Sequence, residues 1–133
     1  MEEFDIAIIG GGPAGIMAAI AASADLNVVL LEKNSSLGSK LLITGGGRCN
    51  ITNEKPIKKL LNSFHDKNFL KHSFYTFTNE MLLDLFRNRG LDFIVEDNNR
   101  VFPETEKSQD ILAILKYYLK DCLLYTSDAA DDL

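Results

Sequence analysis

The fold is decided by the stretch Phe4-Asp5-Ile6-Ala7-Ile8-Ile9-Gly10-Gly11-Gly12-Pro13-Ala14-Gly15 near the N-terminus. It begins with a short apolar run, long enough for one strand of a buried parallel sheet. The glycines predict a turn, and the alanine-rich residues 16–24 predict a helix that packs closely against a sheet. A second apolar run, residues 26–31, ends at Glu32. Strand, glycine turn, helix and strand form a βαβ unit, so the sequence predicts a Rossmann-like α/β fold.

Each residue of the glycine turn suits the binding of a pyrophosphate. Gly10 permits the tight turn, Gly12 lets the pyrophosphate approach the backbone, and Gly15 lets the helix and the strand pack closely. Pro13 fits the first helical turn, where its missing N–H is not needed. With Ala14 in the same turn, the helix N-terminus presents free N–H groups and a partial positive charge to the phosphates.

Glu32 stands where a dinucleotide site needs an acidic residue. It lies 22 positions after Gly10, close to the usual spacing of about 20. A carboxylate there accepts hydrogen bonds from the ribose hydroxyls and repels a 2′-phosphate, which disfavours NADP as the ligand of this site. The alternatives are a tight turn without a ligand and a solvated acidic residue. FAD and NAD share the ADP group, so these residues alone do not separate the two cofactors.

A second glycine-rich loop follows, with the sequence Thr44-Gly45-Gly46-Gly47-Arg48-Cys49-Asn50. It belongs to residues 33–53, which lack periodicity and predict a long loop with one helical turn around residues 37–42. Three adjacent glycines expose the backbone, as a flat or charged ligand requires. Arg48 adds a fixed positive charge, and Asn50 adds a donor and an acceptor. We expect this loop to contact the polar edge of a flavin or an anionic substrate; the alternative is a flexible surface loop.

The remaining chain predicts a mixture of helices and one hairpin. Apolar residues have helical spacing between residues 57 and 77, and Thr78 or Asn79 can cap a helix that runs to residue 89. Residues 93–95 and 100–102 predict two strands joined by a turn at Asn98 and Asn99. Ser108 can cap a last amphipathic helix.

These segments resemble the BaiN/RdsA (YhiN-like) family of FAD-dependent oxidoreductases. The resemblance covers residues 4–120 and rests on the glycine turn, on Leu31-Glu32-Lys33, on residues 38–53 and on Arg100-Val101-Phe102-Pro103. It implies a truncated FAD-binding domain of the glutathione-reductase type, with the turn glycines on the pyrophosphate and Glu32 on the adenosine ribose. We also expect Lys33 to be a cofactor-binding residue. Lys40 and the second glycine loop would lie along the rest of FAD, toward the isoalloxazine.

The expected function is that of an FAD-dependent oxidoreductase in the cytoplasm, reduced by NAD(P)H and acting on a small-molecule substrate. One alternative is an NAD-dependent dehydrogenase, and another is a flavin-binding protein with a structural or RNA-associated role. No catalytic residue can be assigned. Cys49 lacks the second thiol of a disulfide reductase and is interpreted as a packing residue. His65 and His72 lack partners at metal or triad spacing, so no metal site is expected.

The composition excludes several classes of protein. The 133 residues contain 14 basic and 19 acidic side chains, a formal charge of −5, and lack a Lys/Arg cluster. We therefore expect no binding of nucleic acid, whose affinity rests on clustered cations. No apolar run reaches about 18 residues, so no contact with a membrane is expected. Two cysteines are too few for a disulfide scaffold.

The last residues indicate where the native part of the sequence is expected to end. Cys122–Asp131 resembles the translation of a transposase-type sequencing adapter, so we expect a native part of residues 1–121 and a non-native tail of residues 122–133. Without the tail the chain has 14 basic and 16 acidic residues, a charge of −2. A truncated sheet would have an open strand edge. We therefore expect the isolated chain to be inactive, to bind FAD weakly or not at all, and to aggregate.

Overall fold

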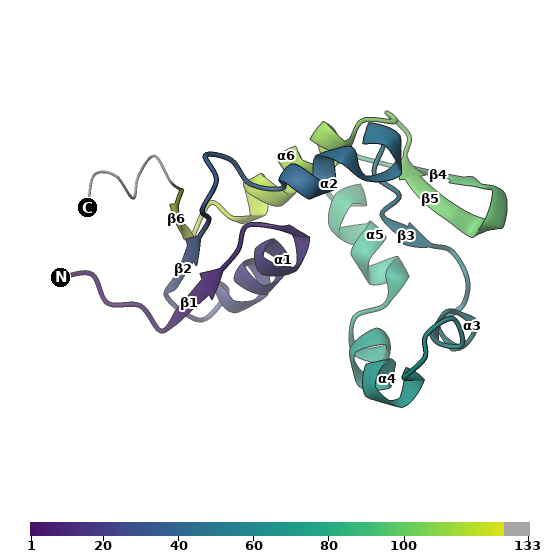
Figure 1. The fold of residues 1–133 in the computed structure, drawn as a ribbon, viewed down its shortest axis with the longest axis horizontal. Coiled ribbons are helices and arrows are strands. Elements are labelled where there is room, and N and C mark those ends of the chain that lie inside the picture. The colour runs from purple at the N-terminus through teal and green to yellow at the C-terminus, as the bar shows by residue number, and fades with distance from the viewer. Residues whose placement is uncertain (127–133) are drawn as a thin grey trace. The chain divides into compact units, whose positions relative to one another are not determined.

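The computed structural model describes residues 1–126, which form two compact units (Figure 1). Of the described residues, one unit contains residues 1–43 and 112–126, and the other contains residues 44–111. The strands are β1 (Ile6–Ile9), β2 (Val28–Leu31), β3 (Thr52–Asn53), β4 (Phe93–Glu96), β5 (Arg100–Pro103) and β6 (Leu123–Tyr125). The helices are α1 (Pro13–Ala22), α2 (Ser39–Ile43), α3 (Ile57–Leu61), α4 (Lys67–Thr76), α5 (Asn79–Arg87) and α6 (Ser108–Tyr118). Short 3-10 segments cover Thr44–Gly47 and Asp97–Asn99.

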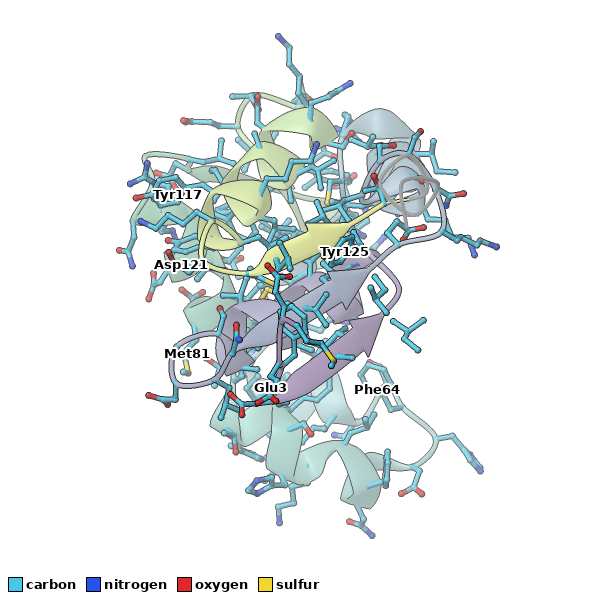
Figure 2. The ribbon with its side chains drawn as sticks, turned by 90° about the vertical axis from the view of Figure 1, so that its left-hand side faces the viewer. Glu3, Phe64, Met81, Tyr117, Asp121 and Tyr125 are labelled. Atoms are coloured by element: carbon cyan, nitrogen blue, oxygen red, sulfur yellow. The ribbon has the colours of Figure 1, made fainter. Side chains whose placement is uncertain are left out.

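The first unit contains a parallel sheet in the order β1-β2-β6, seen face-on in Figure 2. β1 and β2 pair in register from Ile6 opposite Val28 to Ile9 opposite Leu31. Helix α1 packs against both strands and buries Ile16 completely. This arrangement confirms the predicted βαβ unit and with it the Rossmann-like α/β class.

Strand β6 is an element that the sequence did not predict. Leu123 to Tyr125 pair in parallel with β2, from Leu123 opposite Val29 to Tyr125 opposite Leu31. Three apolar residues are too few to show a period, and the strand is recognisable only beside its neighbour. Residues 127–133 of the predicted tail lie outside the described residues, and the non-native origin of residues 122–133 stays a prediction.

The second unit contains an antiparallel sheet in the order β3-β5-β4 and the helices α3, α4 and α5. The Thr78 hydroxyl caps α5 by accepting from the Met81 N–H at 3.2 Å, as predicted. Gly90 follows this helix with a φ of +84°, a left-handed conformation that suits glycine. Asn98 and Asn99 also have positive φ values and form the predicted turn between β4 and β5.

Among the helices of residues 1–126, none has the length and apolar character that a membrane crossing requires.

Candidate functional site

The turn between β1 and α1 requires glycine at positions 10 and 15, whereas Gly12 faces open space. Gly10 has a φ of +105°, and its N–H donates to the Leu31 carbonyl oxygen at 2.8 Å. A Cβ on Gly15 would overlap the Gly10 carbonyl oxygen, which confirms the predicted close approach of helix and strand. A Cβ on Gly12 would have no atom within 4 Å. The open space at Gly12 therefore suits a ligand that lies against the backbone.

Helix α1 begins at this turn without a side-chain cap. Gly12 is the N-cap residue, Pro13 is the first helical residue, and the first turn carries no acidic side chain. The N–H groups of a helix's first turn have no partners within the helix, and they carry a partial positive charge. An anion at this helix end would supply the missing acceptor.

The Glu32 carboxylate lies at the end of β2 and holds the turn in place. Its Oε2 accepts from the Gly11 N–H at 2.6 Å, and its Oε1 accepts from the Asn34 N–H at 2.8 Å. The N–H groups of Asn34 and Gly11 keep the pKa of Glu32 below its ordinary value, so the carboxylate is ionised at neutral pH. A carboxylate has further lone pairs, so Glu32 can still accept from a ribose hydroxyl.

A groove of about 540 Å³ connects these groups. It is lined by Ile9, Gly10, Gly11, Gly12, Pro13, Leu31, Glu32, Lys33, Asn34, Gly38, Ser39 and Lys40. The structure thus brings together most of the predicted residues of the first unit, including both lysines. The sequence analysis did not identify Asn34. The signal that could have found it is its position two residues after Glu32, whose carboxylate accepts from its N–H. An acidic group, free helical N–H groups and two lysines in one groove match the ribose and the phosphates of an ADP moiety.

The second glycine loop belongs to the other unit and forms a left-handed turn. Gly45, Gly46 and Gly47 have φ values of +55°, +67° and +88°. A Cβ on Gly45 would lie 2.7 Å from the Asn50 backbone nitrogen and 2.9 Å from the Phe102 ring. The conformation and the tight packing together explain why glycine occupies position 45. The predicted place of this loop along the cofactor stays a prediction.

Arg48 contacts two carboxylates and an aromatic ring within the second unit. Its Nη1 lies 2.6 Å from Oε1 of Glu96 and 3.0 Å from Oε1 of Glu106, and its Nη2 lies 3.3 Å from Oε2 of Glu96. The guanidinium carbon is 4.0 Å from the centre of the Phe102 ring. Hydrogen bonds with Glu96 and then Glu106 raise the pKa of Arg48, and Arg48 lowers the pKa of Glu96. Sequence reasoning missed these pairs, since Glu96 is 48 residues away. The expected contact of Arg48 with a flavin or substrate stays a prediction.

Cys49 is a buried thiol, 2% exposed, with a left-handed φ of +62°. Burial raises the pKa of this thiol, and a hydrogen bond with Thr44 opposes the shift only in part. The protonated thiol therefore predominates at neutral pH, which fits a packing residue better than a nucleophile. Residues 1–126 hold no group of three or more His, Cys, Asp or Glu side chains placed to bind a metal ion.

Comparison with known proteins places the chain among others of the same architecture. The family model described as "HI0933-like protein Rossmann domain" matches residues 4–127. The chain is 35% identical over 118 residues to the 3-dehydro-bile acid delta(4,6)-reductase of Clostridium scindens, covering 86% of this chain and 28% of that protein. It is 34% identical over 118 residues, with the same coverage, to the ribosomal RNA dihydrouridine synthase of Escherichia coli. The chain thus spans little more than a quarter of the length of these relatives.

A solved structure shares the fold at low sequence identity. The crystal structure of Thermovibrio ammonificans THI4 matches with a TM-score of 0.53 and 16% identity, over 93% of this chain and 38% of that one.

Proposed function

The chain belongs to the HI0933-like Rossmann domain family, and from this premise we propose that it is the FAD-binding part of a flavin-dependent oxidoreductase of the cytoplasm. The observation that carries the proposal is the groove of the first unit. This groove brings together the backbone of Gly12, which faces open space, the N-terminus of α1 and the ionised carboxylate of Glu32. Pyrophosphate and ribose need these groups in this arrangement.

Each group has a defined task in binding. The first-turn N–H groups of α1 would donate hydrogen bonds to the pyrophosphate oxygens of FAD, with Gly12 leaving room for its approach. Glu32 would accept from the adenosine ribose while it holds the Gly11 N–H. Lys33 and Lys40 line the same groove and would add positive charge near the phosphates. The bound flavin supplies the transfer of hydride or electrons, and the protein positions it and excludes competing reactions.

The proposed reaction is a reduction, with NAD(P)H as the electron donor. One relative is named a reductase, and another is named for a product that carries added hydrogen. Their names give substrates of two kinds, a bile acid and ribosomal RNA. An NAD-dependent dehydrogenase is the second candidate, since FAD and NAD present the same ADP group to the turn and to Glu32.

Absorbance of the purified full-length protein separates the two candidates. We expect the bands of an oxidised flavin, which bleach when NADH or NADPH is added without oxygen and return with an artificial electron acceptor. A colourless protein that binds NAD and reduces it with a hydroxylated substrate would instead support the dehydrogenase. A flavin that remains oxidised with both nicotinamides would contradict the proposed donor.

A further inference from the structure

Arg48 is held by carboxylates that come from two other parts of the second unit. Glu96, the last residue of β4, binds the guanidinium through both of its carboxylate oxygens, at 2.6 Å and 3.3 Å. Glu106 binds it at 3.0 Å from the segment between β5 and α6. A bidentate pair fixes the orientation of the guanidinium as well as its position. The second glycine loop is therefore fastened at Arg48 to the hairpin of β4 and β5 and to the segment that follows it.

The buried ring of Phe102 supports both ends of this loop. Phe102 is 1% exposed, and the guanidinium carbon of Arg48 lies 4.0 Å from the centre of the ring. At the other end of the loop, a Cβ on Gly45 would lie 2.9 Å from the same ring. The guanidinium of Arg48 thus has one face on the ring and both Nη atoms on carboxylates, so its contacts are made within the protein.

Unusual backbone conformations also gather at Arg48. Within residues 1–126, the residues with positive φ other than glycine and asparagine are Cys49, at +62°, and Glu106, at +56°. Cys49 follows Arg48 in the chain, and Glu106 is one of its two carboxylate partners. Such conformations cost free energy in residues that carry a Cβ, and they persist where the surrounding structure holds a functional geometry. The strained positions therefore support a preorganised loop rather than a flexible one.

Preorganisation matters for this loop because of its glycines. Three adjacent glycines have many conformations to lose, so an unrestrained loop would have to be ordered by its ligand. Gly46, whose φ is +67°, also leaves the backbone accessible, since a Cβ there would meet no atom within 4 Å. A loop that is already ordered can receive a ligand at this open backbone without that cost.

We propose that Glu96, assisted by Glu106, is a positioning residue for the second glycine loop. It holds Arg48 on the Phe102 ring and so keeps the loop backbone in the shape that receives the cofactor. Arg48 acts within the protein in this role, which replaces the direct contact with a flavin or a substrate that the sequence led us to expect. The assignment rests on the proposed function, because FAD is the ligand that we expect the loop to receive.

Hydrogen–deuterium exchange of the FAD-free full-length protein tests the ordering of the loop without the cofactor. Glu96→Gln keeps the size of the side chain and removes the charge that Arg48 binds. We expect amide exchange of residues 44–50 to become about three- to tenfold faster, because a bidentate, partly exposed pair contributes more than an ordinary surface pair. The matched control is Glu80→Gln, which removes a carboxylate 3.0 Å from Arg87 on α5 and should leave the loop unchanged.

Affinity for FAD, measured by flavin fluorescence, distinguishes a positioning role from a direct contact. If the Arg48 guanidinium touched FAD, Glu96→Gln would release it for that contact, and the affinity would stay the same or increase. A positioning role predicts an affinity about three- to tenfold lower, because fewer molecules have the loop in the competent shape. Arg48→Gln combined with Glu96→Gln should then bind FAD no more weakly than Arg48→Gln alone. Arg48→Lys keeps the charge but not the planar fork, so it should not retain the original affinity.

The two measurements have separate consequences. Unchanged loop exchange in Glu96→Gln, or an FAD affinity that stays the same or rises, overturns the positioning role. Equally faster loop exchange in Glu80→Gln overturns it as well, because the effect would then follow from the loss of charge alone. If the original protein takes up no FAD, the proposed function fails, whereas exchange of the loop still decides whether Glu96 orders it.

A milder variant covers the case in which Glu96→Gln does not fold, which far-UV circular dichroism would reveal. Glu106→Gln keeps the bidentate pair of Glu96 with Arg48 and removes only the second carboxylate. It should change loop exchange and FAD affinity in the same direction by a smaller factor. A folded Glu106→Gln protein with faster loop exchange and undiminished FAD affinity would contradict the link between this ion pair and the cofactor.

Discussion

A negative charge at Gly12 should separate cofactor binding from folding. The backbone there has a φ of −80° and a ψ of 179°, which any residue can adopt, and a Cβ would meet no atom within 4 Å. Gly12 is also the N-cap of α1, and aspartate is a better N-cap than glycine by a few tenths of a kcal/mol. Gly12→Asp should therefore leave the free energy of unfolding unchanged or slightly higher.

The same substitution should strongly weaken the binding of FAD. A carboxylate at this position would add a negative charge where the pyrophosphate is proposed to bind, and two like charges about 4 Å apart repel by about 4 kcal/mol at an effective dielectric constant of 20. At 1.4 kcal/mol for each factor of ten, the dissociation constant of FAD should rise about 1000-fold.

The assay uses the full-length protein after removal of bound FAD. Flavin fluorescence reports FAD binding, and urea unfolding of the FAD-free form reports stability without a contribution from the ligand. Gly12→Asn is the matched control, because it has nearly the same size and capping ability without the charge. We expect Gly12→Asn to weaken FAD binding less than Gly12→Asp does. An affinity of Gly12→Asp within about threefold of the original protein would refute the placement of the pyrophosphate at this turn.

Three further substitutions or treatments test other parts of the structure. Gly15→Ala should lower the free energy of unfolding in urea by about 1–3 kcal/mol or more, because its Cβ would overlap the Gly10 carbonyl oxygen; an unchanged value would contradict this packing. Arg48 holds the pKa of Glu96 below its ordinary value of 4.5, so this carboxylate stabilises the fold above that pH and less as the pH falls. When the pH falls below 4.5, the midpoint temperature of thermal unfolding should therefore decrease less for Glu96→Gln than for the original chain. Midpoint temperatures that decrease equally in both proteins would argue against the ion pair. Iodoacetamide at about pH 8 should label Cys49 only after denaturation, because its thiol is buried and has a raised pKa; rapid labelling of the folded chain would contradict the packing role.

Much of the first unit could be predicted because its determinants are local. The apolar runs, the glycine turn and the alanine-rich helix follow one another within residues 4–31. Steric requirements at Gly10 and Gly15 concern neighbouring residues, so the sequence pattern was enough. The same holds for the Thr78 cap and for the turn at residues 98–99, which depend on groups a few positions apart.

Contacts between distant residues could not be predicted in this way. The partners of Arg48 lie 48 and 58 residues further along the chain, and no spacing rule connects them. Strand β6 consists of three residues whose strand character depends on β2. Lys58, Lys67 and Lys71 line one groove only after helices α3 and α4 have packed against each other.

The sequence by itself therefore determined the βαβ unit, the glycine turn and the acidic residue that follows β2. It also determined the family, through motifs that are contiguous in the chain. The tertiary structure alone decided which carboxylates pair with Arg48, that Gly12 faces open space and that positive charge gathers between α3 and α4. The physical reason is range: backbone sterics and helix capping act between near neighbours, whereas ion pairs, grooves and strand pairing depend on the path of the whole chain.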